Sequence, residues 1–232
     1  MAETISCSWC TTASLSIRRN RTIRRALRDG KPRAVRRVAR KADVSQPNRR
    51  LTVGICILAG GLSTRMGRDK SKLRLGSRSL LQHVQEVADA LALPVRIILK
   101  DKVARCGPVG GIYTGLITSE HDAELFLACD MPFVATRSLR TFVSFYRKSG
   151  GPAFASGRLV GFPCIIPTGA SATVMECISA GGLSLQGLAR KLGASYLRGG
   201  SVRSLTNLNT PADLQRARML LSLQQRHSGK KA

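Results

Sequence analysis

The chain has 232 residues, of which 43% are hydrophobic and 22% are charged. That length and composition suit one domain of ordinary size with an appendage, and they exclude a chain that is disordered throughout. The formal net charge of +25 favours polyanionic partners such as nucleotides, phosphorylated metabolites or nucleic acid, although a well-solvated cationic surface also accounts for much of it.

Residues 1–50 differ from the rest of the chain. They hold 14 basic and 3 acidic residues, a balance of +11, with few large apolar side chains. Such a segment cannot bury enough surface to offset its ordering entropy, so we expect a basic extension that is disordered or loosely docked. An organellar transit peptide, a nucleic-acid-binding tail and a start codon assigned too far upstream remain alternatives.

From Leu51 onward, short apolar runs alternate with stretches of helical periodicity, which predicts an α/β fold with a mostly parallel sheet and helices on both faces. We assign one domain to residues 51–225, followed by a short basic tail at 226–232. Strands are expected at 51–59, 94–99, 123–129, 151–156 and 162–167, and helices at 79–93, 110–119, 137–148, 183–192 and 209–221.

The last of these helices has a clear start signal. Thr210 can cap it, Pro211 suits its first position and Asp213 interacts favourably with the helix dipole.

The seven cysteines do not form a disulfide framework or a zinc site. Cys7 and Cys10 are a lone pair, the others lie far apart, and the three histidines are not at metal-binding spacing. We therefore expect reduced, mostly buried thiols in a cytoplasmic protein. No apolar run reaches membrane-spanning length and the first residues lack a signal-peptide pattern, so no membrane partner is expected.

The loop after the first strand, "AGGLSTRMGRDKSK", combines glycines with cations. Gly60 and Gly61 allow a sharp bend with exposed backbone N–H groups, and Arg65 and Lys70 add mobile positive charge. A structural turn needs the glycines but not the cations. The alternative, a plain glycine turn with solvated cations, is left open by the loop alone. A phosphate-rich ligand would use both features.

Two aspartates follow later strands. Asp101 precedes the glycine-rich segment "CGPVGGIYTG", and Asp130 directly follows the apolar run "AELFLAC". In parallel sheets, ligands bind beyond the carboxyl ends of the strands, where Asp130 could hold Mg²⁺. A helix-capping role for Asp130 is the alternative.

Four motifs occur in an order and spacing that are typical of a known protein family: "LAGGLSTRMGRDK", "CGPVGGIYTGL", "LACDMPF" and "NLNTPADL". Over about residues 53–219, the chain resembles the molybdenum cofactor guanylyltransferase family of nucleotidyltransferases. The resemblance implies a three-layer fold of the nucleotide-diphospho-sugar transferase type with a Rossmann-like nucleotide-binding half. It also implies Mg²⁺ as cofactor, GTP and Mo-molybdopterin as substrates, and contacts with molybdoenzymes or cofactor chaperones.

The resemblance assigns roles to residues of these motifs. Lys70, Asp130 and Arg65 are implied as catalytic, with Asp130 as the metal ligand. Asn207 and Asn209 resemble the asparagines near the acceptor site. The residues implied in nucleotide binding are Leu58, Ala59, Gly60, Gly61, Lys70, Asp101 and Asp130.

The chain departs from the family pattern at one place. Family members run a strand ending in a nucleotide-contacting asparagine, then a helix, before the segment that matches "PVRIILKD", whereas here Leu93 leads straight into Pro94. The Ala-Gly-Gly sequence nevertheless implies GTP rather than CTP, with Gly60 leaving room for a purine. We expect GTP to bind several-fold more weakly than in a relative that keeps this strand.

Nothing in the motifs supplies a histidine base, and a phosphate nucleophile needs none, because its second pKa is about 6. Two other functions remain open. One is a transferase for a sugar phosphate or another phosphorylated acceptor. The other is a basic nucleic-acid-binding protein with an inactive transferase-like domain, for which aromatic residues at 4% give little stacking capacity.

Overall fold

The computed structural model describes residues 50–60, 73–157, 160–198 and 207–228, with side chains described as far as residue 222. The expectations for residues 1–49 and 229–232 lie outside these ranges. A six-stranded sheet forms the centre of the described part, in the order β4-β1-β5-β7-β6-β8. Its strands are β1 (Val53–Leu58), β4 (Val95–Ile98), β5 (Ala123–Ala128), β6 (Ala153–Ser156), β7 (Val160–Pro167) and β8 (Ser195–Arg198).

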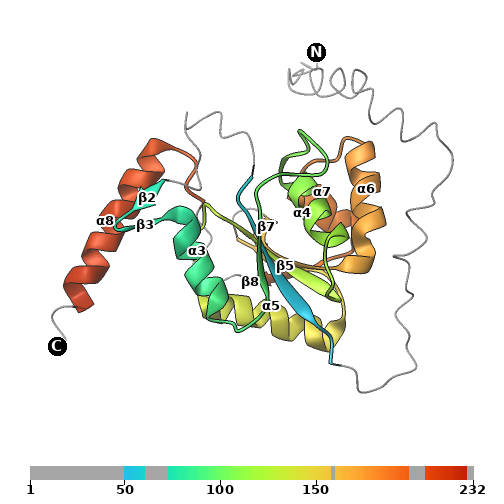
Figure 1. Cartoon of the computed structure of the whole chain (residues 1–232), viewed down its shortest axis with the longest axis horizontal. Helices are drawn as coiled ribbons and strands as arrows, with labels where there is room; N and C mark the ends of the chain where they lie inside the picture. The colour runs from blue at the N-terminus through green and yellow to red at the C-terminus, as the bar shows by residue number, and fades with distance from the viewer. Residues whose placement is uncertain (1–49, 61–72, 158–159, 199–206, 229–232) are drawn as a thin grey trace, which may run out of the picture.

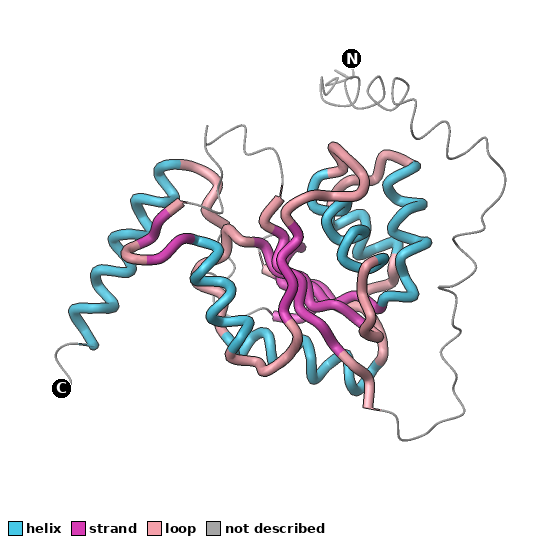
Figure 2. Tube along the Cα trace, in the orientation of Figure 1, coloured by secondary structure: helices cyan, strands magenta, loops and turns pink. Residues whose placement is uncertain are grey.

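Strand β7 runs antiparallel to its neighbours β5 and β6, and the other neighbouring pairs in this sheet are parallel. Helices cover both faces, as Figures 1 and 2 show: α3 and α5 contact each other on one face, and α4, α6 and α7 on the other. The predicted three-layer, mostly parallel α/β fold is confirmed. The helices are α3 (Leu80–Asp89), α4 (Gly107–Ile117), α5 (Thr136–Ser149), α6 (Ser171–Ser179), α7 (Leu185–Lys191) and α8 (Pro211–Ser228), with a short 3-10 turn, η3, at Thr168–Ala170.

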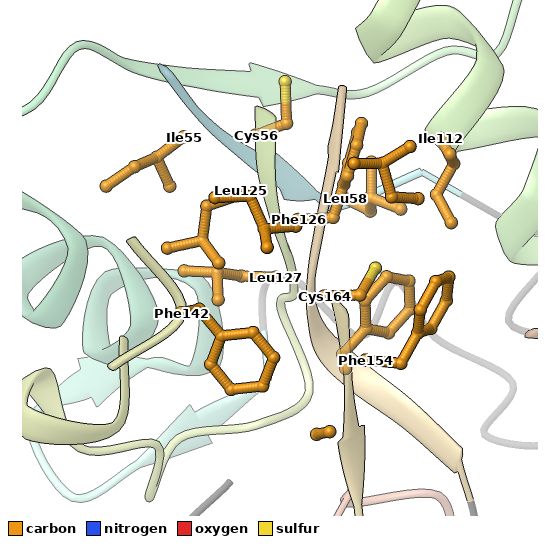
Figure 3. Close-up of a cluster of buried hydrophobic side chains, with 14 of the residues drawn as sticks. Ile55, Cys56, Leu58, Ile112, Leu125, Phe126, Leu127, Phe142, Phe154 and Cys164 are labelled. Carbon is orange, nitrogen blue, oxygen red and sulfur yellow. The ribbon is translucent and has the colours of Figure 1, made fainter. Parts of the chain in front are cut away.

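The continuous apolar runs form the centre of the sheet because they are covered on both faces. All six residues of β1 are buried, and so are the first five of β5. Figure 3 shows how successive side chains alternate: Ile55 and Leu127 lie on the side of Phe142 from α5, and Leu58 and Phe126 lie on the side of Ile112 from α4. The core therefore extends through both helical layers.

Helix α3 follows its sequence pattern closely. Its predicted apolar stripe buries Leu80, Val84 and Ala88, and a capping box opens it. The Ser79 hydroxyl accepts the Gln82 N–H at 3.2 Å, and the Gln82 side chain accepts the Ser79 N–H at 2.7 Å.

Helix α8 packs against a small hairpin, β2 (Arg74–Leu75) with β3 (Arg78–Ser79), and we call these elements together the hairpin–α8 unit. Figure 1 shows the unit on the side of α3 away from α4, α6 and α7. Its core is a second apolar cluster, separate from the main one, with partly buried Leu73, Phe133 and Leu221 at its margin. The buried members of this second cluster are Leu75, Leu80, Leu208, Leu214 and Ala217.

The edge of the sheet at β4 agrees with the expected departure from the family pattern. Helix α3 connects through residues 90–94 to β4, which pairs directly with β1. Within the described ranges, no strand lies on the other side of β4. The sheet therefore ends at β4 in the described part of the chain.

The cysteines in the described ranges are free thiols, as expected. Cys56, Cys106, Cys129 and Cys164 are buried and Cys177 is partly buried. None of the helices described is both long and apolar enough to cross a membrane.

Candidate active site

The carboxyl ends of β1, β4 and β5 lie at the same edge of the sheet. Leu58, the last residue of β1, is in register with Ile98 of β4 and with Ala128 of β5. The chain therefore leaves three neighbouring strands side by side, toward Ala59–Gly60, Asp101 and Asp130. This edge is where ligands bind in sheets of this kind.

The backbone at the end of β1 is fixed by hydrogen bonds to both neighbouring strands. The N–H groups of Ala59 and Gly60 both donate to the Ile98 carbonyl at 3.0 Å, and the Leu58 carbonyl accepts the Cys129 N–H at 3.1 Å. These three predicted nucleotide-binding residues thus form a rigid margin of the strand-end edge.

The structure gives a different reason for glycine at position 60 from the one that the sequence suggested. A Cβ atom on Gly60 would lie 2.5 Å from the Leu99 carbonyl oxygen and 2.9 Å from its carbon. The idea that the missing side chain leaves room for a purine is therefore wrong, because the backbone of Leu99, directly after β4, fills that space. Glycine is needed here for close backbone packing.

Asp101 lies where the loop after β4 meets the first turns of α4. Its carboxylate oxygens are 3.3 and 3.4 Å from the positions that Cβ atoms on Gly110 and Gly111 would occupy. Burial in this position raises the pKa of Asp101 above its usual value. Burial also raises the pKa of the neighbouring Cys106 thiol, with a further contribution from the Asp101 charge. The glycine pair thus makes room for a partly desolvated carboxylate.

Asp130 follows β5 as predicted, and it lies beside a segment that is distant in sequence. The Leu208 N–H donates to the Asp130 carbonyl at 2.9 Å, and the Leu208 side chain is buried in the cluster of the hairpin–α8 unit. Asn207 and Asn209, both exposed, therefore lie on either side of a residue that contacts Asp130. The structure brings together the predicted metal ligand and the two predicted acceptor-site asparagines.

The start of α8 holds this segment in place. The Asp213 carboxylate accepts the N–H groups of Asn209 and Thr210 at 3.1 and 2.9 Å and the Thr210 hydroxyl at 2.8 Å. In return, the Thr210 hydroxyl accepts the Asp213 N–H at 3.1 Å, so the predicted cap is present. These bonds, with that from Thr210 first, lower the pKa of Asp213.

The residue types around Asp130 fit Mg²⁺, which prefers carboxylate and amide oxygens. Among the described residues there is no group of three or more histidine, cysteine, aspartate or glutamate side chains that could hold a metal. Mg²⁺ does not need one, since it is usually bound by one or two carboxylates together with substrate phosphates and water. The Asp130 carboxylate is a ligand type that fits an incomplete site of this kind.

Three predicted site residues lie outside the described ranges. Gly61, Arg65 and Lys70 belong to the segment 61–72, so their roles stay predictions from the sequence.

Two polar side chains that were not expected to matter are buried. One is Thr114 on α4, which is 3% exposed, and the other is Glu124 on β5, which is fully buried and forms an ion pair with the partly exposed Arg96. A charged residue inside the apolar run of β5 was a signal for the second, and a threonine within a glycine-rich helix was a signal for the first.

The Arg96–Glu124 pair ties three strands to the carboxyl end of α4. Arg96 donates to Glu124 at 2.8 Å and to the Gly115 and Thr118 carbonyls at 3.1 and 2.9 Å. Glu124, which is fully buried, also accepts from the Ser119 hydroxyl at 2.5 Å and from the Cys56 thiol at 3.3 Å. Burial raises the pKa of Cys56, so the thiol remains protonated and can donate.

The sequence of this chain matches a known family. The sequence profile of the MobA-like NTP transferase domain matches residues 55–196, more than half of the chain. The chain belongs to this family.

Curated relatives of the chain bear one activity in their names. It is 29% identical over 119 residues to a probable molybdenum cofactor guanylyltransferase of Flavobacterium johnsoniae, which covers 45% of this chain and 63% of the relative. For a Methanothermobacter thermautotrophicus protein of the same name, the figures are 34% over 116 residues, 41% and 59%. A third, from Pelotomaculum thermopropionicum, is 27% identical and is matched over 71% of this chain and 91% of its own length. The chain thus covers less than two thirds of the first two relatives.

Solved structures share the fold at lower identity. Molybdopterin-guanine dinucleotide biosynthesis protein A of Archaeoglobus fulgidus has a TM-score of 0.59 at 21% identity, covering 73% of this chain and 98% of that one. The 2-C-methyl-D-erythritol 4-phosphate cytidylyltransferase of Thermus thermophilus has a TM-score of 0.56 at 15% identity, covering 73% and 98%. Both likenesses agree with the predicted fold class.

Proposed function

We propose that this protein is a guanylyltransferase that transfers GMP from GTP to the terminal phosphate of Mo-molybdopterin and releases pyrophosphate. Relatives bearing the name molybdenum cofactor guanylyltransferase support the reaction. The observation that carries it is the hydrogen bond from the Leu208 N–H to the Asp130 backbone carbonyl, which places the segment with Asn207 and Asn209 beside Asp130 at the strand ends. Such an arrangement suits an enzyme that must align two phosphorylated substrates at one metal-binding residue.

The nucleotide would lie across the ends of β1 and β4. The rigid backbone at Ala59 and Gly60 would support it from one side, and the Asp101 carboxylate would accept hydrogen bonds from guanine N–H groups or ribose hydroxyls. Arg65 and Lys70, which follow the glycines in the sequence, would offset the negative charge of the triphosphate. Guanine carries N–H donors that a carboxylate can accept, whereas adenine and cytosine present a different pattern of donors and acceptors on the corresponding edge. A carboxylate at this position therefore favours GTP.

In the reaction, an oxygen of the acceptor phosphate attacks the α-phosphorus of GTP. A new phosphorus–oxygen bond forms, the bond to the β-phosphate oxygen breaks, and pyrophosphate leaves with the electron pair. The acceptor phosphate is already largely ionised at neutral pH, so the chain needs no general base. Its residues align the substrates and neutralise charge. Mg²⁺ held by Asp130 would supply further charge neutralisation at the phosphate oxygens.

The test is to measure pyrophosphate release from each of the four nucleoside triphosphates in Mg²⁺ buffer, with and without Mo-molybdopterin. We expect release from GTP only when Mo-molybdopterin is present. Release with a sugar phosphate in place of Mo-molybdopterin would identify another transferase. The absence of release from any triphosphate, together with salt-dependent nucleic-acid binding that is lost on deleting residues 1–50, would contradict an enzymatic role.

A further inference from the structure

The hydroxyl of Thr114 joins two segments beside Asp101. It accepts the N–H of Lys102, the residue after Asp101, at 2.8 Å and donates to the Gly110 carbonyl at 2.9 Å. A threonine in a helix commonly donates to the carbonyl four residues before it. Here the same oxygen also accepts the Lys102 N–H from the β4–α4 loop. The hydroxyl therefore links the helix to the loop.

The link is buried. Thr114 is 3% exposed, whereas Lys102 is exposed, so the backbone of Lys102 is held by an atom inside the protein while its side chain faces solvent. An N–H group directed into a buried position needs an acceptor, and the Thr114 hydroxyl provides it. Replacing the hydroxyl by a methyl group would remove this acceptor without changing the side-chain shape.

The same link sets where Asp101 lies. Its carboxylate rests over Gly110 and Gly111, and the Thr114 hydroxyl is bonded to the carbonyl of Gly110 itself. The peptide that follows Asp101 is therefore tied to the helical turn on which the carboxylate rests. If the loop moved away from α4, the carboxylate would leave the glycine surface and become more hydrated.

We propose that Thr114 is a positioning residue for nucleotide recognition, which holds the loop after β4 on α4 so that the Asp101 carboxylate faces the strand ends in one orientation. This inference rests on the proposed function, because it takes Asp101 as a nucleotide contact. Thr114 itself is buried under the loop and acts through Asp101.

The test compares Thr114→Val with Thr114→Ser by titration calorimetry with Mg-GTP. Thr114→Val should weaken binding about fivefold to tenfold, the loss expected when a carboxylate contact is misplaced. Thr114→Ser keeps the hydroxyl and should bind within about twofold of wild type. Thr141→Val is the matched control, because Thr141 makes the same bond to a carbonyl four residues before it, at 3.2 Å to Arg137 on the exposed side of α5. Thr114→Ala replaces Thr114→Val if the valine variant does not fold.

A double-mutant cycle separates positioning from a general structural effect. In an Asp101→Asn background, Thr114→Val should cause no further loss of Mg-GTP affinity, since the group through which Thr114 acts is already altered. An equal fold-loss in both backgrounds, or wild-type affinity of Thr114→Val, would overturn the proposal.

A measurement without nucleotide distinguishes failure of this inference from failure of the proposed function. An NMR pH titration of the Asp101 carboxyl carbon should show a lower pKa in Thr114→Val than in wild type, because release from α4 hydrates the carboxylate. An unchanged pKa overturns the positioning role even if GTP binds. If the wild-type protein binds no GTP but the Asp101 pKa is lower in Thr114→Val than in wild type, Thr114 still positions the loop. The proposed guanylyltransferase function is then contradicted.

Discussion

The β4–α4 side of the sheet and the hairpin–α8 unit both bring polar residues to the candidate site, but different interactions hold them. On the β4–α4 side, the Lys102 N–H donates to the buried Thr114 hydroxyl, which attaches the loop that carries Asp101 to α4, and Arg96 of β4 donates to the Gly115 carbonyl of the same helix. In the hairpin–α8 unit, the asparagines are held by a small apolar cluster around Leu208, by a backbone bond to Asp130 and by the exposed hydrogen bonds of Asp213 at the start of α8.

This difference indicates how the two substrates would be handled. A buried polar network fixes geometry strongly, because breaking one bond leaves a polar group unpaired in surroundings of low dielectric constant. A small apolar cluster at the margin opens at lower cost, since few contacts must be lost. We therefore expect the nucleotide side to be rigid and the acceptor side to be the part that adjusts.

The largest expected effect is on stability, from breaking the buried ion pair. Arg96→Met leaves the fully buried Glu124 without its cation and should lower the free energy of unfolding by roughly 3 kcal/mol, measured by urea denaturation. Arg78→Met is the control, since the Arg78–Glu86 pair is half exposed and is worth about 0–1 kcal/mol. Equal losses in the two variants would contradict the contrast between buried and exposed pairs.

The next effect concerns the small cluster. Leu208→Ala should cost about 2 kcal/mol, at the lower end for a buried leucine because the cluster can collapse. Turnover with the acceptor should fall while Mg-GTP affinity stays within about twofold, because Leu208 supports only the acceptor side. Met219→Ala, at a side chain on α8 that is 68% exposed, serves as the control. Loss of GTP affinity in Leu208→Ala would show that the two sides are not separate.

A smaller effect is expected at the start of α8. Thr210→Ala removes the cap and should cost about 1 kcal/mol of stability, whereas Thr210→Ser should restore it.

Because hydrogen bonds lower the pKa of Asp213 in the folded protein, the contribution of Asp213 to stability is present above the usual carboxyl pKa. It should be lost as the pH falls through the lowered value. Unfolding curves of wild type and Asp213→Asn between pH 6 and 2 check this, and identical pH dependence would contradict it.

The smallest effect has the opposite sign. Burial raises the pKa of Asp101, so its ionised form is less favourable in the folded protein than in the unfolded chain at neutral pH. Asp101→Asn should therefore raise the melting temperature slightly at pH 7. The gain should disappear as the pH falls through the folded pKa toward the usual carboxyl value. The same variant should lose GTP affinity, so a stable variant that binds GTP normally would remove Asp101 from the site.

The sequence predicted the elements whose burial can be read locally. The continuous apolar runs became β1 and β5, and the position of Asp130 followed because an aspartate after such a strand must lie at the strand ends. Helix α6 was not predicted, since only Val174 and Ile178 mark its buried face. Strand β8 was missed too, because most of its residues are exposed.

Contacts between distant segments could not be predicted from local patterns. Gly60 is glycine because of the Leu99 carbonyl just beyond the end of β4, whereas the sequence motif alone suggested a ligand in that space. Arg96 and Glu124 lie on different strands, so neither residue reveals the other. The roles of Gly61, Arg65 and Lys70 remain predictions, and the glycine–cation combination still supports them.

In the proposed reaction, Asp130 holds the metal at the point where nucleotide and acceptor meet. The most direct test is pyrophosphate release by Asp130→Ala in Mg²⁺ with GTP and Mo-molybdopterin, alongside Asp89→Ala at an exposed site where α3 ends. We expect Asp89→Ala to match wild type and Asp130→Ala to keep its fold but fall below about a tenth of wild-type turnover, a barrier increase of more than about 1.4 kcal/mol. An Asp130→Ala variant that retains more than this turnover would contradict the account.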